Sequence, residues 1–183
     1  MSTTAPDIGA AYLKDVIRQF RMFKGYADKA IARVPDAHLH TELDANSNSI
    51  AVIVKHVAGN LISRYRDFLT TDGEKPDRDR DREFEMTDRV PREEILRWWD
   101  DGWSVAFGSI EALTPEDLER TVYIRGEGFL VIEALSRSVT HAASHVGQIV
   151  YLARHFAGDA WTSLTIPKGA SANVKGEFKT RPT

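Results

Sequence analysis

Two histidines lie four residues apart in the segment Thr140-His-Ala-Ala-Ser-His-Val-Gly-Gln148, and a third, His56, lies in an earlier segment with a helical pattern. On an α-helix, residues four apart share one face, with Cβ atoms about 5 to 6 Å apart. The imidazoles of His141 and His145 could therefore converge on one divalent cation, with His56 as a third ligand from a neighbouring helix. Three protein ligands leave one coordination position open, where an ion such as zinc lowers the pKa of bound water or of a thiol.

The spacing alone is also typical of two histidines at the edge of a core that hydrogen-bond to backbone or water. The surrounding pattern favours the metal interpretation. Apolar residues between about 130 and 156 form a wide arc on a helical wheel, and His141, His145 and Gln148 form a stripe along its edge. The stripe therefore points partly inward, toward the rest of the protein.

A second polar row, His56, Asn60 and Arg64, runs at intervals of four residues through the apolar face of the segment from about 50 to 69. Buried polar groups without partners cost about 1 to 3 kcal/mol each, so three in a row indicate a polar cleft. In the alternative interpretation, Arg64 extends its charged end to solvent and Asn60 hydrogen-bonds to the backbone.

Four short motifs span most of the chain: His56-Val-Ala-Gly-Asn60; Asp72-Gly-Glu-Lys-Pro76 followed by Arg80-Asp81 and Glu83-Phe84; His141-Ala-Ala-Ser-His145-Val-Gly-Gln148; and Ile166-Pro-Lys-Gly169. The first and third resemble the metal motif of the DinB/YfiT-like superfamily of metalloenzymes. The second and fourth resemble markers of a bacterial subfamily of unknown function within it.

This resemblance implies an all-α four-helix bundle, commonly dimeric, that holds nickel, zinc or a similar ion through three histidines. The ligands correspond to His56, His141 and His145. Some members of the superfamily are thiol-dependent transferases or isomerases that use bacillithiol, mycothiol or glutathione, whereas others have no established activity. The residues do not choose between zinc and nickel, because imidazole suits both.

Composition indicates an ordinary globular protein. The 183 residues, 42% of them hydrophobic, suit a single domain over 1–183 with one core. The net charge of −3 and the dispersed basic residues argue against nucleic-acid or membrane-surface binding. No apolar run reaches transmembrane length and residues 1–7 lack a signal-peptide pattern, so we expect a cytoplasmic protein. Because the chain has no cysteine, any thiol must be a small external cosubstrate.

Hydrophobic periodicity predicts four helices: from about 8 to 34, from 50 to before 72, from 91 to 113 and from 130 to 156, with Asp7 and Ser49 as N-caps. Residues 121–124 and 129–131 flank a turn-like segment and predict a small hairpin or a plain loop. Trp98, Trp99 and Trp103 have a helical spacing that favours a core or a helix–helix interface over a cofactor site. Residues 158–183 read as an irregular tail.

The connector between the second and third helices, residues 72–90, is strongly charged, with thirteen charged residues among the eighteen from 72 to 89. Mixed charge of this density is typical of a solvated linker. So long a crossover permits an up-down-down-up bundle, since the helices it joins need not be antiparallel. The resemblance implies that the connector is ordered and roofs the metal site, where Arg78, Arg80 and Asp81 could bind substrate.

We expect a metal-dependent enzyme that acts on a small molecule, because a structural zinc site would use four protein ligands. Thiol-dependent transfer is the favoured reaction; hydrolysis by activated water, or a non-catalytic metal-binding stress-response bundle, are the alternatives. Asn60, Arg64, Gln148, Arg80 and Asp81 are the expected substrate-binding or ligand-supporting residues. We also expect a homodimer, because the last helix is apolar over more of its circumference than a bundle helix needs, and the third carries the tryptophans.

Overall fold

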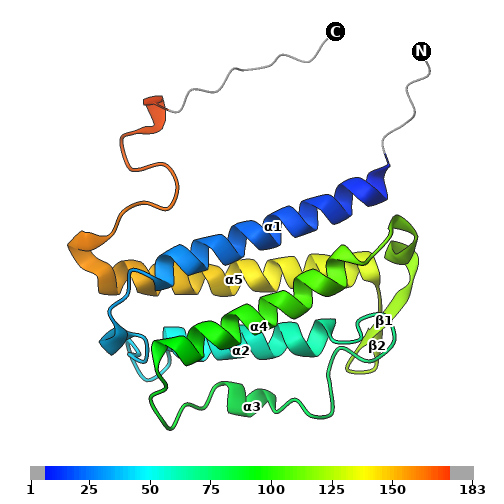
Figure 1. The fold of residues 1–183 in the computed structure, drawn as a ribbon, viewed down its shortest axis with the longest axis horizontal. Helices are drawn as coiled ribbons and strands as arrows, with labels where there is room; N and C mark the ends of the chain where they lie inside the picture. Colours follow the sequence, from blue (N-terminus) through cyan, green and yellow to red (C-terminus); the bar gives the residue numbers. More distant parts are fainter. Residues whose placement is uncertain (1–6, 174–183) are drawn as a thin grey trace.

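The structure, a computed structural model, describes residues 7–173 and is dominated by four long helices (Figure 1). These are α1 (Ile8–Ile31), α2 (Ile50–Tyr65), α4 (Arg92–Glu111) and α5 (Val131–Ala157). A short helix, α3 (Arg80–Glu83), lies in the charged connector, and a hairpin of β1 (Thr121–Ile124) and β2 (Glu127–Leu130) precedes α5. Short 3₁₀ turns cover 36–38, 115–119, 158–160 and 171–173. The remaining part of the predicted tail, 174–183, lies outside the described residues.

The ends of the helices follow from local hydrogen bonding. Asp7 caps α1 by accepting from the amide of Ala10, and Ser49 caps α2 by accepting from that of Val52, which confirms both predicted N-caps. The third helix begins at Arg92, one residue later than predicted, because Pro91 has an extended conformation and is itself the N-cap.

Three helix ends meet at one end of the bundle. The guanidinium of Arg92, at the start of α4, donates to the carbonyls of Ile31 and Val34 at the end of α1. The amide of Ala51, in the first turn of α2, donates to the carbonyl of Leu39 at 2.9 Å. Helix α1 therefore arrives at this end, whereas α2 and α4 both leave from it.

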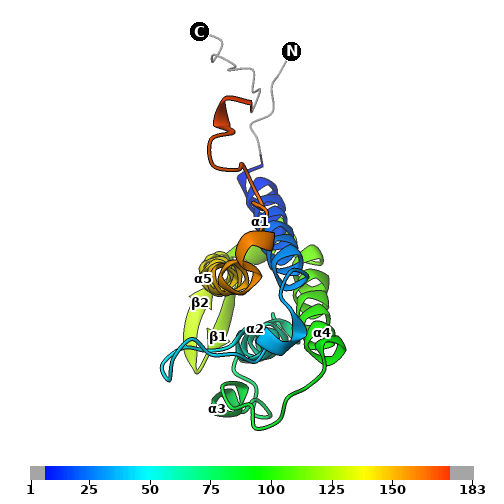
Figure 2. The same ribbon diagram turned by 90° about the vertical axis from the view of Figure 1, so that its left-hand side faces the viewer.

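The opposite end joins the other helix termini. The hydroxyl of Ser109 in α4 donates to the carbonyl of Tyr65, the last residue of α2, and the hydroxyl of Tyr12 in α1 donates to the carbonyl of Ile132 in α5. The four helices thus run up, down, down and up (Figure 1). Seen end-on, they surround a common centre, and α3 lies outside α2 (Figure 2). Helix α2 packs mainly on α4, and α1 mainly on α5.

The core contains two of the three clustered tryptophans. Trp99 and Trp103 are 1% and 0% exposed, and Trp103 meets Phe20 edge-to-face with ring centroids 5.4 Å apart. Trp98 is partly buried at the margin of the same core. The preference for a core position over a cofactor site is therefore confirmed. Within residues 7–173, no helix combines the length and the apolarity needed to cross a bilayer.

Helix α2 ends at Tyr65, several residues before the predicted end. Arg66 is extended and Asp67 has a φ of 52°, a left-handed conformation that aspartate tolerates better than most residues. The turn returns Phe68 to the core, where it is 8% exposed. Helix α1 likewise ends three residues early, at Ile31, and Val34 is buried in the turn that follows.

The hairpin and the connector are joined to each other. The hairpin turn has positive φ at Arg125 and Gly126, as a two-residue type I′ turn requires, and Asp72 accepts from both amides at 2.8 and 2.7 Å. The amide of Gly73 donates to the carbonyl of Tyr123 at 2.7 Å. The connector is therefore an ordered segment, as the resemblance implied, and not the solvated linker that its composition favoured.

Candidate metal centre

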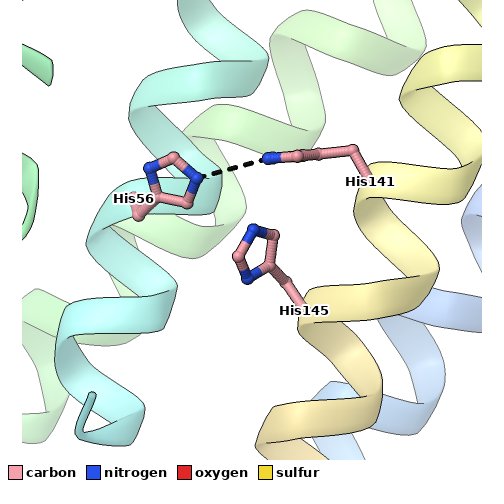
Figure 3. A group of neighbouring side chains, drawn as sticks. All are labelled: His56, His141 and His145. Carbon is pink, nitrogen blue, oxygen red and sulfur yellow. Dashed lines mark hydrogen bonds between the residues drawn. The ribbon is translucent and has the colours of Figure 1, made fainter. Parts of the chain in front are cut away.

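The three predicted ligands converge. His56 from α2 and His141 and His145 from α5 bring ring nitrogens within 4.8 Å of one another (Figure 3). The Nε2 atoms of His56 and His141 are 3.2 Å apart. Nitrogens bound tetrahedrally at about 2.0 to 2.1 Å from zinc lie about 3.3 Å from each other. The arrangement therefore fits a single divalent ion with little movement of the side chains.

Neighbouring acceptors orient two of the three rings. Nδ1–H of His56 donates to a carboxylate oxygen of Glu83 at 2.8 Å, and Nδ1–H of His145 donates to the amide oxygen of Gln148 at 2.9 Å. With the proton on Nδ1, each ring keeps its free lone pair on Nε2, the atom that a metal needs. Gln148, placed beside the histidines by its position in the inward stripe, thus acts through His145.

The site favours neutral imidazoles. Burial, followed by the repulsion of His145 and His56, lowers the pKa of His141 to about 3. Burial also lowers the pKa of His145, an effect that its hydrogen bond to Gln148 partly offsets. Both rings are consequently neutral at pH 7, and a metal ion does not have to displace protons from them.

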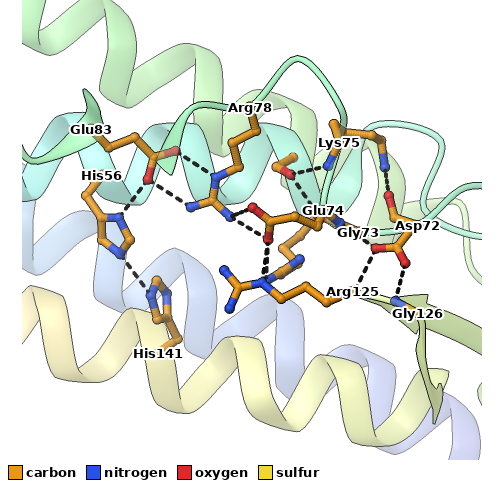
Figure 4. A network of polar contacts seen from close by, with 12 residues as sticks. His56, Asp72, Gly73, Glu74, Lys75, Arg78, Glu83, Arg125, Gly126 and His141 are labelled. Atoms are coloured by element: carbon orange, nitrogen blue, oxygen red, sulfur yellow. Dashed lines mark hydrogen bonds and ion pairs between the residues drawn. The ribbon is translucent and has the colours of Figure 1, made fainter. Parts of the chain in front are cut away.

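Glu83, in α3, lies behind His56. Its side chain is 8% exposed and accepts from Nε and Nη2 of Arg78 at 2.7 and 2.8 Å as well as from His56 (Figure 4). Burial raises the pKa of Glu83, but the hydrogen bonds from Arg78 and His56 outweigh it and hold the pKa below its ordinary value. An ionised carboxylate behind a ligating histidine fixes the ring and makes it more basic.

Gly59 makes room for this carboxylate. A Cβ at that position would lie 2.9 Å from the carboxyl carbon of Glu83 and closer still to its Oε1. The glycine of the motif His56-Val-Ala-Gly-Asn60 is therefore required by the approach of the connector to α2. The sequence marks Glu83 only as part of the second motif. Its spacing among the eight acidic residues between 72 and 89 does not predict a contact with His56.

A cavity of about 300 Å³ opens beside the histidines. Asn60 and Arg64 line it, as the polar row indicated, and the Arg64 side chain is only 11% exposed, so it does not extend into solvent. Burial lowers the pKa of its guanidinium. The full lining is His56, Asn60, Arg64, Arg78, Arg80, Phe84, Ile124, Arg125, Arg137, Ser138, His141 and His145.

The connector contributes Arg78 and Arg80 to this wall but not Asp81. The Asp81 side chain is 92% exposed, lies 4.0 Å from Nη1 of Arg80 and is not part of the cavity lining, so its substrate-binding role stays a prediction. Phe84 packs against the ring of His56, with centroids 4.5 Å apart, and closes the site from the connector side.

The fold and the cluster of three histidines define the chain as a four-helix-bundle protein with a candidate metal site beside an open polar cavity. The chain belongs to the family described as "Protein of unknown function (DUF1572)", whose model matches residues 7–170. No curated protein matches the sequence.

A solved structure shares the fold. YfiT from Bacillus subtilis, described as a probable metal-dependent hydrolase with an unusual four-helix bundle topology, matches with a TM-score of 0.64 and 17% sequence identity. The match covers 88% of this chain and 93% of YfiT. The expected four-helix-bundle fold is thereby confirmed.

Proposed function

We propose that this protein is a metal-dependent hydrolase of a small molecule, with a zinc or nickel ion on His56, His141 and His145. One observation carries the proposal: three imidazoles, two of them oriented through Nδ1, turn toward one point at the wall of an open cavity. A structural zinc site is usually closed by a fourth protein ligand, whereas a catalytic site keeps that position for substrate or water. The description of YfiT as a probable metal-dependent hydrolase supports hydrolysis.

The residues of the chain have separable tasks in this proposal. A divalent ion on the histidines would supply a Lewis acid and lower the pKa of a bound nucleophile. Glu83 and Gln148 hold the rings of His56 and His145. Asn60 and Arg64 line the space in which a substrate would be oriented. Among the described residues, no carboxylate lines that space.

That lack of a carboxylate in the described lining favours a second candidate, thiol-dependent transfer. A thiol bound to a metal ion loses its proton outright at neutral pH and needs no general base from the protein. The chain contains no cysteine, so the thiol would be a low-molecular-weight cosubstrate.

Metal analysis of protein purified without chelators tests the site itself. We expect about one divalent ion per chain in the wild type. The double variant His141→Ala, His145→Ala should retain none, since it leaves one ligand. His155→Ala is the matched control, because His155 lies on the same helix but is exposed and outside the cluster. Stoichiometric metal in the double variant would refute the site.

Turnover assays separate the reactions. The metal-loaded protein is incubated with a panel of esters, amides and alkylating electrophiles, with and without glutathione, bacillithiol or mycothiol. Metal-dependent turnover that ignores thiol supports the hydrolase, and turnover that requires thiol supports the transferase. No turnover across the panel would favour a non-catalytic metal-binding bundle.

A further inference from the structure

Arginines dominate the cavity wall beyond the three histidines. Five guanidinium groups line it and, within the described part of the chain, no aspartate or glutamate does; they belong to Arg64, Arg78, Arg80, Arg125 and Arg137. The chain as a whole carries a net charge of −3, so this positive charge is a local concentration. A cleft lined by charge of one sign raises the local concentration of oppositely charged ligands.

The carboxylates behind the wall compensate this charge only in part. Glu83 is engaged by Arg78 and His56. Glu74 is shared. Its Oε2 lies 3.3 Å from Nη1 of Arg78 and 3.2 Å from Nε of Arg125 (Figure 4), and it also lies 3.3 Å from Nη2 of Arg64. One carboxylate therefore serves three guanidinium groups, and they retain unused capacity to bind an anion.

Arg64 and Arg137 both keep guanidinium donors that no carboxylate among the described residues engages. Arg64 is nearly buried, and no acceptor within residues 7–173 pairs with its buried Nη1. Gly73 leaves room for this side chain, because an added Cβ there would lie 3.1 Å from Cδ of Arg64. Arg137, on α5, pairs with no carboxylate in the described chain and lies over the ring of Phe129 at 5.6 Å. Arg64 and Arg137 line the same cavity, from α2 and α5.

We propose that the cavity binds small molecules through a phosphate or carboxylate group, held by Arg64 and Arg137 beside the three histidines. The guanidinium group presents paired N–H donors that match such oxyanions. A volume of about 300 Å³ suits a small ligand and not a macromolecule. This assignment rests on the proposed function in one respect, that the bound anion is the substrate.

Calorimetric titration of the full-length protein tests the assignment, both as purified and after a chelator has been added and dialysed away. The probes are inorganic phosphate and succinate, with glycerol as a neutral control. We expect at least one anion to bind in the chelator-treated protein, and Arg64→Gln and Arg137→Gln to weaken that binding about tenfold or more.

Arg66→Gln is the matched control, because it removes the same charge at the residue that follows α2. The Arg66 side chain pairs with exposed Asp77 and lies outside this cavity. It should bind the anion as the wild type does. Circular dichroism checks the fold of each variant, and Arg137→Gln, at an exposed position, decides the matter if Arg64→Gln does not fold.

Three results would overturn the proposal: neither anion binds, the folded Arg64 and Arg137 variants bind like the wild type, or Arg66→Gln loses as much affinity as they do. Preference for phosphate or for succinate identifies which oxyanion the substrate carries. Anion binding is measured without metal, so the two tests are independent. A protein that binds no metal can still bind the anion, and loss of anion binding does not affect the metal analysis.

Discussion

Replacing Glu83 by glutamine would separate the proposed metal-supporting role of the connector from its role in the fold. The carboxylate accepts from His56 and twice from Arg78, and its side chain is 8% exposed. Glutamine keeps the shape but presents one oxygen and one NH₂ group. Whichever way the amide turns, its NH₂ faces a donor, either the His56 ring or the Arg78 guanidinium.

The expected magnitudes follow from these contacts. Hydrogen bonds to charged groups contribute about 1.5 to 3 kcal/mol each, and breaking a buried ion pair costs about 3 to 5 kcal/mol. Arg78 keeps Glu74 as a weaker partner at 3.3 Å, so we expect a loss near the lower bound, about 3 kcal/mol. Loss of a carboxylate behind a metal-bound histidine lowers metal affinity about 10- to 100-fold.

Urea denaturation of chelator-treated Glu83→Gln measures the first effect, and competition with a chromophoric zinc chelator measures the second. ¹⁵N NMR of the His56 ring reports whether Nδ1 still carries the proton, which a purely structural role of Glu83 would not alter. Asp81→Asn, in the same short helix but 92% exposed, is the control and should change stability by less than about 0.5 kcal/mol. Equal zinc affinity in Glu83→Gln and Asp81→Asn would refute the reasoning.

Three further outcomes are expected. Gly59→Ala should displace Glu83 and lower both Tm and metal affinity. Gly108→Ala is the control, because its added Cβ meets nothing within 4 Å, and it should stabilise α4 by about 0.5 to 1 kcal/mol. Equal shifts in Tm would contradict the close approach of Glu83 to Gly59. Because the pKa of His141 falls to about 3 in the folded protein from 6.5, the unfolded chain takes up the proton first. Stability in urea and metal retention should therefore be full above pH 6.5 and fall as the pH decreases toward 3, and a flat profile would count against a buried neutral ring. The chain should form a homodimer, and a monomer by light scattering at micromolar concentration would disprove it.

The cluster of three histidines was predictable because its signals are local. His141 and His145 are one helical turn apart, and His56, Asn60 and Arg64 interrupt an apolar face at the same period. Such patterns depend on helix geometry alone. The convergence of the two rows on one point then follows from the contact of α2 with α5.

The support behind His56 was not predictable, because it depends on the path of a long connector. Glu83 lies 27 residues after His56 in the chain. The connector between them is held by the hydrogen bond of Asp72 to the hairpin turn and by that of Arg78 to Glu83, and neither contact follows from local sequence patterns. The end of α2 was misjudged for a related reason. Phe68 continues the apolar period of the helix, but it reaches the core through a left-handed Asp67.

The tie between connector and hairpin also bears on how quickly a bound ion could leave. Asp72 is bonded to the hairpin turn, and farther along the connector Glu83 and Phe84 contact the ring of His56, so an opening of the connector would release that ring. Local opening of such a segment is a separate step with its own rate. The lifetime of a metal complex here would therefore be set by the opening of residues 72–90, and substitutions at the hairpin turn, remote from any ligand, would change the rate of metal exchange.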